Sequence, residues 1–222
     1  MSASSPYTGD VEVGGPADVR ELPGLTISKL AVSEMANNAY LLRDTATGEA
    51  LLIDAAAEPA ALLALIGNAP LSVVVTTHGH WDHHRALTDL VVATGATTVA
   101  HPADASDLPV SVDRKVEHGD TVTFGGQTLD VIHLRGHTPG SIALVWRGPG
   151  GAGVHVFTGD SLFPGGPGRT TNPEDFNSLM DDLEERIFGR FADSTWFYPG
   201  HGNDSTLGVE RPHLGEWRAR GW

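Results

Sequence analysis

The sequence predicts one α/β domain, built from short strands that alternate with helices. Short apolar runs recur along the chain and are bounded by turn residues, in a composition with 27 Gly and 14 Pro. Segments of helical composition lie between several of these runs, and no repeat of about 20–50 residues is visible. With 222 residues, of which 40% are hydrophobic, the chain can bury one substantial core. We expect a flexible polar arm at 1–23 and a single domain at 24–222.

In the first half of the domain, each expected strand is a short apolar or β-branched run. These strands are expected at 25–32, 39–42, 50–53, 73–76 and 97–100. A helix is expected at 58–66, where the residues EPAALLALI precede Gly67 and Asn68. A second helix is expected at 84–94, and Gly95 ends it.

The second half repeats the alternation. Strands are expected at 121–124, 127–134, 141–146, 154–157 and 195–198. Gly125 and Gly126 join the first two of these as a hairpin. One helix is expected at 173–188, with Asn172 as its N-cap residue and Pro173 in its first position. The tail after His201 is expected to be irregular.

Charge and composition exclude several classes of function. Lys and Arg number 14 against 28 Asp and Glu, and the resulting net charge of −14 disfavours nucleic-acid binding. The sequence contains no Cys, which excludes disulfides, thiolate catalysis and cysteine-ligated zinc. A metal site must therefore use His and carboxylates. No apolar run approaches the ~18 residues of a membrane span, and residues 1–10 lack a secretion signal, so we expect a cytoplasmic protein.

The segment 77–84, with the sequence THGHWDHH, follows an expected apolar strand. His78 and His80 are two residues apart, so they point the same way on extended backbone. Asp82 and His83 follow where the chain turns toward the next helix. Imidazole and carboxylate are the usual ligands of a catalytic zinc ion, and they also suit iron or manganese. The segment therefore predicts a metal site.

Further candidate ligands come directly after later strands. They are His137, Asp160 and His201, and each is preceded by a Gly that lets the backbone turn tightly. Asp54 likewise closes the strand expected at 50–53. Functional side chains at strand ends along one edge are typical of a site built from loops on a rigid scaffold.

The order of these motifs resembles that of the metallo-β-lactamase superfamily. The resemblance spans about residues 25–210 and rests on His-x-His-x-Asp-His, followed by separate His, Asp and His residues after strands. It implies an αββα sandwich with two divalent metal ions between the sheets, expected to be Zn²⁺, with Fe or Mn as alternatives. One metal would be held by His78, His80 and His137. The other would be held by Asp82, His83 and His201. Asp160 would bridge the two metals, and Asp54 would orient their ligands.

Within the superfamily, the sequence GDSLF at 159–163 and GRT at 168–170 resemble the glyoxalase II and persulfide dioxygenase branch. In that branch the basic residue after the Gly often meets the carboxylate or thiol-cofactor part of the substrate. The resemblance therefore implies that Arg169 and Thr170 bind substrate. Trp81 is expected either to line the pocket mouth and contact substrate or to pack against its own loop. The chain is most similar to the short, single-domain glyoxalase II-like hydrolases.

The resemblance implies a metal-dependent hydrolase of small acyl thioesters or esters, similar to hydroxyacylglutathione hydrolase. The metals would lower the pKa of a bound water and supply hydroxide to the carbonyl, and Asp82 would receive a proton during turnover. One alternative is a mononuclear iron persulfide dioxygenase that uses only His78, His137 and Asp160. A lactonase needs the same chemistry as the hydrolase. The alternative from another class is a metal-stabilised binding module without catalysis.

Overall fold

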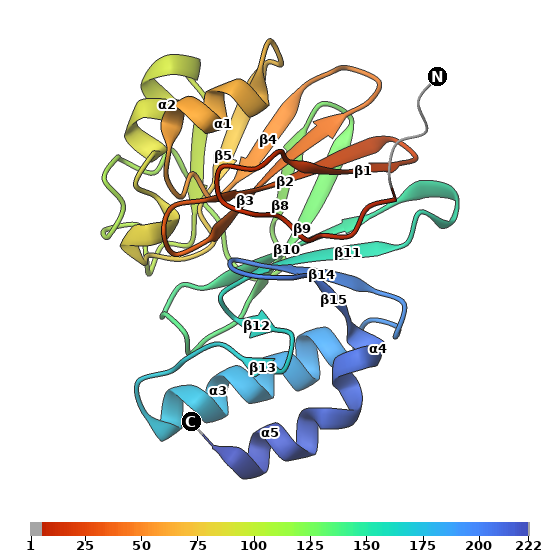
Figure 1. Ribbon diagram of the computed structural model, residues 1–222. Helices are drawn as coiled ribbons and strands as arrows, with labels where there is room; N and C mark the ends of the chain where they lie inside the picture. Colours follow the sequence, from red (N-terminus) through yellow and green to blue (C-terminus); the bar gives the residue numbers. More distant parts are fainter. Residues whose placement is uncertain (1–5, 222) are drawn as a thin grey trace.

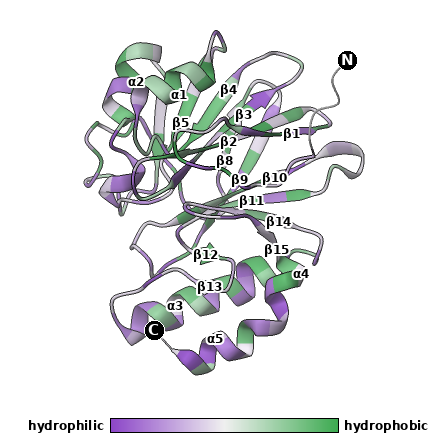
Figure 2. Cartoon of the chain, in the orientation of Figure 1, coloured by the Kyte–Doolittle hydropathy of each residue, from purple (hydrophilic) through white to green (hydrophobic). Residues whose placement is uncertain are grey.

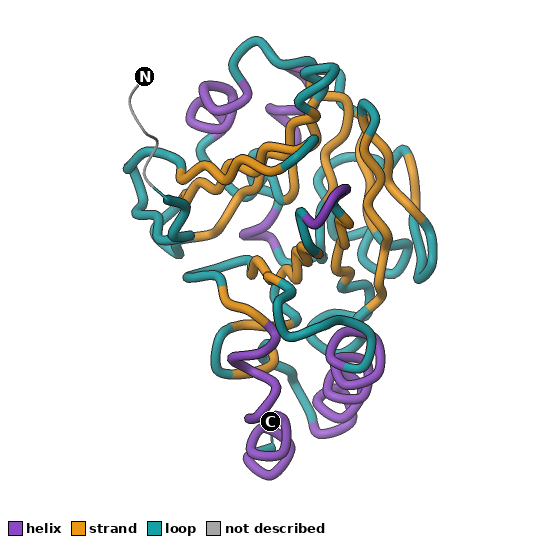
Figure 3. The backbone as a smooth tube through the Cα atoms, turned by 90° about the vertical axis from the view of Figure 1, so that its right-hand side faces the viewer, coloured by secondary structure: helices purple, strands orange, loops and turns teal. Residues whose placement is uncertain are grey.

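The computed structural model of the protein describes residues 6–221. Its elements form four layers, with two β-sheets in the middle and helices on both outer faces (Figure 1). A view turned by 90° shows the same order, with helices above and below the strands (Figure 3). The αββα sandwich expected from the sequence is therefore confirmed.

The first sheet has seven strands that follow the order of the sequence. They are β1 (Asp18–Leu22), β2 (Leu25–Val32), β3 (Asn37–Asp44), β4 (Ala50–Ile53), β5 (Leu71–Val75), β6 (Thr97–Ala100) and β7 (Arg114–Lys115). Strands β1 to β4 pair antiparallel, and β4 to β7 pair parallel. The carboxyl ends of the parallel strands lie at one edge, which is where ligands bind in sheets of this kind.

The second sheet has six strands in the order β15-β14-β11-β10-β9-β8. They are β8 (Thr121–Phe124), β9 (Gln127–His133), β10 (Ile142–Arg147), β11 (Val154–Gly159), β14 (Trp196–Pro199) and β15 (Ser205–Thr206). The parallel pair β11 and β14 brings Gly159 beside Pro199. Asp160 and His201 therefore emerge close together. A separate short hairpin is formed by β12 (Leu162–Phe163) and β13 (Gly166–Pro167).

Helices α1 (Pro59–Ile66) and α2 (Leu87–Thr94) cover the first sheet (Figure 1). The second sheet is covered by α3 (Pro173–Asp182), its π-helical continuation η3 (Leu183–Phe188), α4 (Leu207–Glu210) and α5 (Leu214–Arg220). The Asn172 side chain accepts the Asp175 N–H at 2.8 Å, which confirms it as the N-cap of α3. Among residues 6–221, no helix is both long enough and apolar enough to cross a membrane.

Three apolar clusters join the four layers. The central cluster lies between the sheets and includes Leu51 of the first sheet and Phe157 of the second. The other two clusters seat the helices, with Leu62 of α1 in one and Leu179 of α3 in the other. Figure 2 shows β4 as hydrophobic and α5 as largely hydrophilic, as expected for an inner strand and an outer helix. This framework holds the loops at the sheet edge.

Two expectations about the ends of the domain are corrected. Part of the arm expected to be loose at 1–23 is β1, an edge strand that pairs with β2 and alternates between half-buried and exposed residues. Residues 1–5 of that arm lie outside the described residues. The tail after His201 forms β15, α4 and α5 rather than irregular structure. It is ordered because Trp217 packs into the apolar cluster of the second sheet.

The helix expected at 84–94 begins three residues later, at Leu87. The preceding residues Trp81–His83 form a 3₁₀ turn, η1, and the His83 N–H donates to the His80 carbonyl at 3.0 Å. This turn buries Asp82 and His83 and leaves Trp81 exposed. Residues 81–83 therefore form a separate turn that buries Asp82 and His83, and they do not extend the helix.

A buried ion pair ties the N-terminal segment to the segment after His201. Lys29 Nζ lies 2.8 Å from Asp204 Oδ1, and both side chains are fully buried. The same ammonium donates to the Gly202 carbonyl at 2.8 Å and to the Gly9 carbonyl at 2.6 Å. Tyr7 Oη donates to the second Asp204 oxygen at 2.5 Å. Three segments distant in sequence therefore meet at Lys29.

His155 on β11 is buried in its neutral form. Its Nδ1 accepts the Tyr198 hydroxyl at 2.7 Å, and its Nε2–H donates to the Ala152 carbonyl at 3.0 Å. Burial lowers the pKa of His155 to about 4. The unfolded chain, with an ordinary pKa of about 6.5, therefore takes up a proton between about pH 6.5 and pH 4 that the folded chain refuses.

We expect the free energy of unfolding to fall as the pH drops through this window. His155→Gln removes this contribution, so the stability advantage of the wild type over the variant should shrink by about 1–2 kcal/mol between about pH 7 and pH 5. Urea titrations of both proteins at the two pH values measure the change. An advantage that is equal at both pH values contradicts the burial of a neutral His155.

Candidate metal centre

The His-rich segment leaves the carboxyl end of β5 and crosses the edge of the sheet before α2 begins. His78, His80 and His137 meet there, with ring centroids 4.5–4.9 Å apart. One nitrogen from each ring lies within 4.8 Å of the others. We call these residues the three-His group. The distances suit three ligands around one cation, as the sequence motif predicts.

A second group contains Asp82, His83 and His201. Asp82 Oδ2 lies 3.6 Å from His83 Nε2 and 3.4 Å from His201 Nε2. Two ligands at about 2.1 Å from one tetrahedral cation are about 3.4 Å apart, so the spacing suits a shared ion. We call these residues the Asp-His group.

Asp160 lies between the two groups. Its Oδ1 is 3.4 Å from His83 Nε2, and its Oδ2 is 3.5 Å from His201 Nε2 and 3.7 Å from His137 Nε2. The carboxylate thus reaches ligands of both groups at once. Gly200 makes this approach possible, because a Cβ there would lie 2.1 Å from Asp160 Oδ1.

Each of four imidazoles uses Nδ1 to bind the protein and turns Nε2 toward the centre. His78 Nδ1 contacts Thr77 Oγ1 at 3.0 Å, and His137 Nδ1 donates to the Arg169 carbonyl at 2.7 Å. His201 Nδ1 donates to the Met35 carbonyl at 2.9 Å. The fourth contact is made by Asp54, as the resemblance implied. Such partners fix the tautomer and the direction of a ligand.

Asp54 is a buried hub that serves both groups. Its Oδ2 accepts His83 Nδ1–H and the Thr77 hydroxyl, each at 2.8 Å, and its Oδ1 accepts the Thr77 N–H at 2.8 Å. The Thr77 hydroxyl is therefore left to accept His78 Nδ1–H. Through Thr77, one carboxylate orients a histidine in each group.

The atoms that face the centre lack other partners. Within the described part of the chain, His78 Nε2, His83 Nε2, His137 Nε2 and Asp160 Oδ1 are buried without a hydrogen bond. Buried polar atoms are normally paired, so this concentration calls for a bound species. Nitrogen and carboxylate donors in such an arrangement fit divalent metal ions.

The electrostatics agree with this fit. Burial and the neighbouring imidazoles hold the pKa of His78 well below its usual value, and burial also lowers the pKa of His137. Burial acts against protonation of His83 too, but the Asp54 and Asp160 carboxylates outweigh it and raise its pKa to about 10. His78 and His137 therefore present neutral lone pairs. The carboxylates make the other side of the centre attractive to positive charge.

Both carboxylates facing the centre are ionised. Burial alone would raise the pKa of Asp160, but the charge of His83, whose Nε2 lies 3.4 Å from Asp160 Oδ1, lowers it below its ordinary value. Burial likewise opposes ionisation of Asp82, but the Asn37 amide, at 2.8 Å, and His83 lower its pKa. Two negative charges thus stand among the imidazoles before any cation binds.

The expected substrate-binding residues are dispersed. Trp81 is 58% exposed, and the Arg85 guanidinium lies 4.7 Å from its ring centroid. The Arg169 carbonyl holds His137, while its side chain and Thr170 line a pocket of about 360 Å³ with Arg220. Arg169 therefore has a backbone role at the centre that its side-chain chemistry did not indicate.

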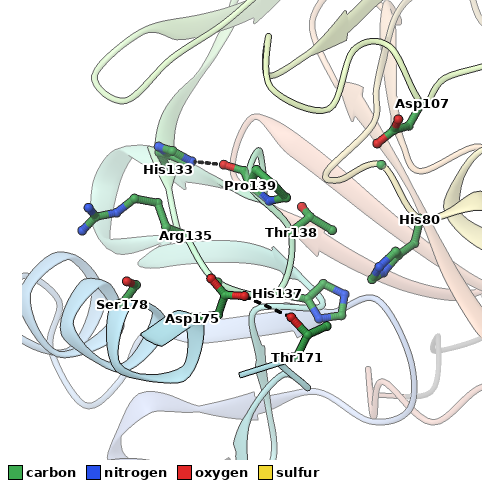
Figure 4. Close-up of a pocket in the computed structure, with 12 residues that line it drawn as sticks. His80, Asp107, His133, Arg135, His137, Thr138, Pro139, Thr171, Asp175 and Ser178 are labelled. Atoms are coloured by element: carbon green, nitrogen blue, oxygen red, sulfur yellow. Dashed lines mark hydrogen bonds between the residues drawn. The ribbon is translucent and has the colours of Figure 1, made fainter. Parts of the chain in front are cut away.

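A larger pocket, of about 590 Å³, opens beside the three-His group (Figure 4). His80 and His137 lie at one end, and Arg135 and Ser178 lie at the other. The Arg135 guanidinium forms two hydrogen bonds to the Asp182 carboxylate, at 2.6 and 2.8 Å. The pocket gives a small molecule access to one face of the three-His group.

Sequence reasoning missed the residues that position the ligands. Asn37 holds Asp82, and its backbone pairs with His201 as an isolated bridge. The Met35 carbonyl fixes the His201 ring. Met35 lies in the turn before β3 and Asn37 begins β3, and a short polar stretch with two Asn residues carries no distinctive signal of a metal site.

The chain is similar to known proteins of one family. A family model described as the metallo-beta-lactamase superfamily matches residues 32–201. The hydroxyacylglutathione hydrolase of Fuscovulum blasticum is 40% identical over 134 residues, which are 60% of this chain and 51% of that protein. The chain spans about half the length of several of the curated relatives it matches.

Two solved structures share both fold and sequence similarity. ETHE1 from Myxococcus xanthus is 32% identical with a TM-score of 0.76, over 87% of this chain and 84% of that one. TTHA1623, solved in a di-iron-bound form, is 32% identical with a TM-score of 0.67, over 82% of this chain and 96% of that one. Together with the αββα fold and the family match over most of its length, these similarities show that the chain belongs to the metallo-beta-lactamase superfamily.

Proposed function

We propose that the protein is a hydrolase that binds two divalent metal ions and cleaves small acyl thioesters. The name of the similar hydroxyacylglutathione hydrolases describes a reaction of this class. The observation that carries the proposal is the position of Asp160 between two groups of three ligands each. Similarity to hydroxyacylglutathione hydrolases supports the thioester class. Similarity to a protein solved with two irons supports a two-metal centre.

The three-His group would hold one cation and the Asp-His group the other, with Asp160 contacting both. When bound, the two cations would supply a water of lowered pKa and a Lewis acid for the carbonyl oxygen. Asp82 is suited to take up a proton at Oδ1, because Asn37 occupies Oδ2. The pocket beside His80 and His137 would hold part of the substrate against the centre.

For the remaining part of the substrate, we propose two separate contacts, the exposed Trp81 ring and the pocket lined by Arg169 and Thr170. Arg169 is exposed and positively charged, so it suits a carboxylate of the substrate. Trp81 offers an exposed aromatic face near the ligands Asp82 and His83.

An Arg169→Met variant should raise KM for an anionic thioester more than it lowers kcat, because a remote contact contributes to binding of both ground and transition states.

A substrate panel tests the proposed function. The protein, purified without chelators, is assayed with acyl thioesters, lactones and a persulfide while oxygen is monitored. Thioester hydrolysis without oxygen uptake is the expected result. Oxygen uptake with the persulfide assigns the centre instead to one iron on His78, His137 and Asp160. Metal bound without turnover of any compound in the panel points to a binding module.

Replacing Asp54, which orients a histidine of each group, is expected to lower the affinity for metal. Asp54→Asn keeps the shape of the side chain but replaces an acceptor by an amide NH₂ that opposes the donors from Thr77 and His83. We expect both groups to bind Zn²⁺ about 10–100-fold more weakly, the usual cost of losing a partner behind a ligand. Competition with a chromogenic chelator measures this, and unchanged affinity contradicts the hub role.

A further inference from the structure

Asp104 belongs to neither ligand group, yet its carboxylate contacts both loops of the three-His group. It lies in the loop between β6 and β7 and is 1% exposed. Its Oδ2 accepts the Gly79 N–H at 2.8 Å and the Thr138 hydroxyl at 2.5 Å, and its Oδ1 accepts the Gly140 N–H at 2.7 Å. Gly79 separates His78 from His80, and Thr138 directly follows His137.

The two glycines allow the carboxylate to approach this closely. A Cβ on Gly140 would lie 2.6 Å from Asp104 Oδ1, and a Cβ on Gly79 would lie 3.2 Å from Asp104 Cβ. The first distance is shorter than real side chains tolerate. The Gly140 N–H can therefore reach the carboxylate only because this position lacks a side chain, and the absence of a side chain at Gly79 relieves a tight contact.

The turn after His137 is closed around the same carboxylate. The Thr138 N–H donates to Ser141 Oγ at 3.1 Å, and the two hydroxyl oxygens are 2.7 Å apart. Since the Thr138 hydroxyl proton goes to Asp104, the Ser141 hydroxyl donates to Thr138 Oγ1. The turn thus has a single consistent hydrogen-bond pattern that ends on Asp104.

We propose that Asp104 is a positioning residue that sets the distance between His78 and His80 on one loop and His137 on the other. The proposal rests on the proposed two-metal centre, since it concerns the metal affinity of the three-His group. Thr77 and Arg169 orient individual rings, and the Ile142 N–H donates to the Thr77 carbonyl at 2.9 Å where the two loops meet their strands. Beyond that backbone bond, Asp104 accepts hydrogen bonds from both loops. Hydrogen bonds to a buried, charged acceptor are among the stronger ones in proteins.

Asp104→Asn tests the proposal, because the amide keeps the size of the side chain but turns a donor toward one of the three donors. Asp113→Asn is the matched control. Asp113 Oδ2 accepts the Thr98 N–H and hydroxyl, both at 2.9 Å, so it anchors the other end of the same loop without contacting a ligand loop. Zn²⁺ affinities are measured by chelator competition. His80→Ala and His201→Ala assign each binding step to its group.

We expect Asp104→Asn to weaken the step of the three-His group at least about tenfold and to change the step of the Asp-His group by less than about threefold. Asp113→Asn should leave both steps within about twofold of the wild type. Wild-type affinity of the three-His group in a folded Asp104→Asn protein overturns the proposal. Equal weakening by Asp113→Asn overturns it too, because the effect then belongs to the loop as a whole.

If Asp104→Asn does not fold, Thr138→Val decides. It removes one donor to Asp104 and keeps the backbone, and we expect about threefold to tenfold weaker binding at the three-His group, restored by Thr138→Ser. No change in Thr138→Val overturns the proposal. A wild type that binds no metal overturns the proposed function and this inference with it, whereas normal two-step binding that Asp104→Asn leaves intact overturns the inference alone.

Discussion

Replacing Asp160 by Ala is expected to reduce thioester hydrolysis at least about 100-fold and to lower the amount of bound metal. Asp160 supplies the two oxygens that face His83, His201 and His137. Ala leaves both groups of ligands in place but removes the charge and the contact between them. One imidazole cannot replace it, because a neutral ring offers one lone pair and the carboxylate offers two oxygens.

The fold of the Asp160→Ala protein should survive. The residue directly follows Gly159, the last residue of β11, at the sheet edge, so the substitution creates no large cavity in the core. Asp130→Ala is the matched control, because Asp130 is an exposed aspartate of the same sheet that pairs with Arg147. Activity, metal content and the midpoint of thermal unfolding are measured for both variants. An Asp160→Ala protein with two metals and near-normal activity contradicts the bridging role.

Lys29→Met is expected to destabilise the protein by about 3–5 kcal/mol. The substitution leaves the Asp204 carboxylate fully buried without its partner, and the carbonyls of Gly9 and Gly202 lose a donor. The Tyr7 hydroxyl still reaches Asp204 but brings no charge. Guanidinium titration of the metal-free proteins measures the effect directly.

Arg147→Met provides the comparison for Lys29→Met. The ion pair of Arg147 with Asp130 is about half exposed on both sides, at 55% and 43%, so its loss should cost less than about 1 kcal/mol. We therefore predict that Lys29→Met lowers the free energy of unfolding much more than Arg147→Met does. Similar costs for both contradict the view that burial, rather than ion pairing itself, makes Lys29 important.

The candidate ligands could be recognised in the sequence because their chemistry is concentrated in short motifs. His78, His80, Asp82 and His83 fall within six residues. The other three, His137, Asp160 and His201, each follow an expected strand. Strand positions followed from apolar runs, and β2, β4, β6 and β8 have the expected bounds. What these elements share is a local pattern that needs no knowledge of distant contacts.

The supporting residues could not be predicted, because tertiary contacts define them. Asn37 and Asp104 act on ligands or on the backbone of ligand loops from other parts of the chain. Arg169 orients His137 through its carbonyl, which every residue type has. The helix α5 has only seven residues and includes a Gly, so its order depends on Trp217 and the cluster beneath it.

We propose that hydrolysis depends on two metals held by two separable groups of ligands. Metal content and thioester turnover are measured together for the wild type, His80→Ala and His201→Ala, each purified without chelators. We predict two metals per chain in the wild type, about one in each variant, and loss of most turnover in both. A metal-free wild type that hydrolyses thioesters as fast as the metal-bound wild type contradicts the two-metal proposal.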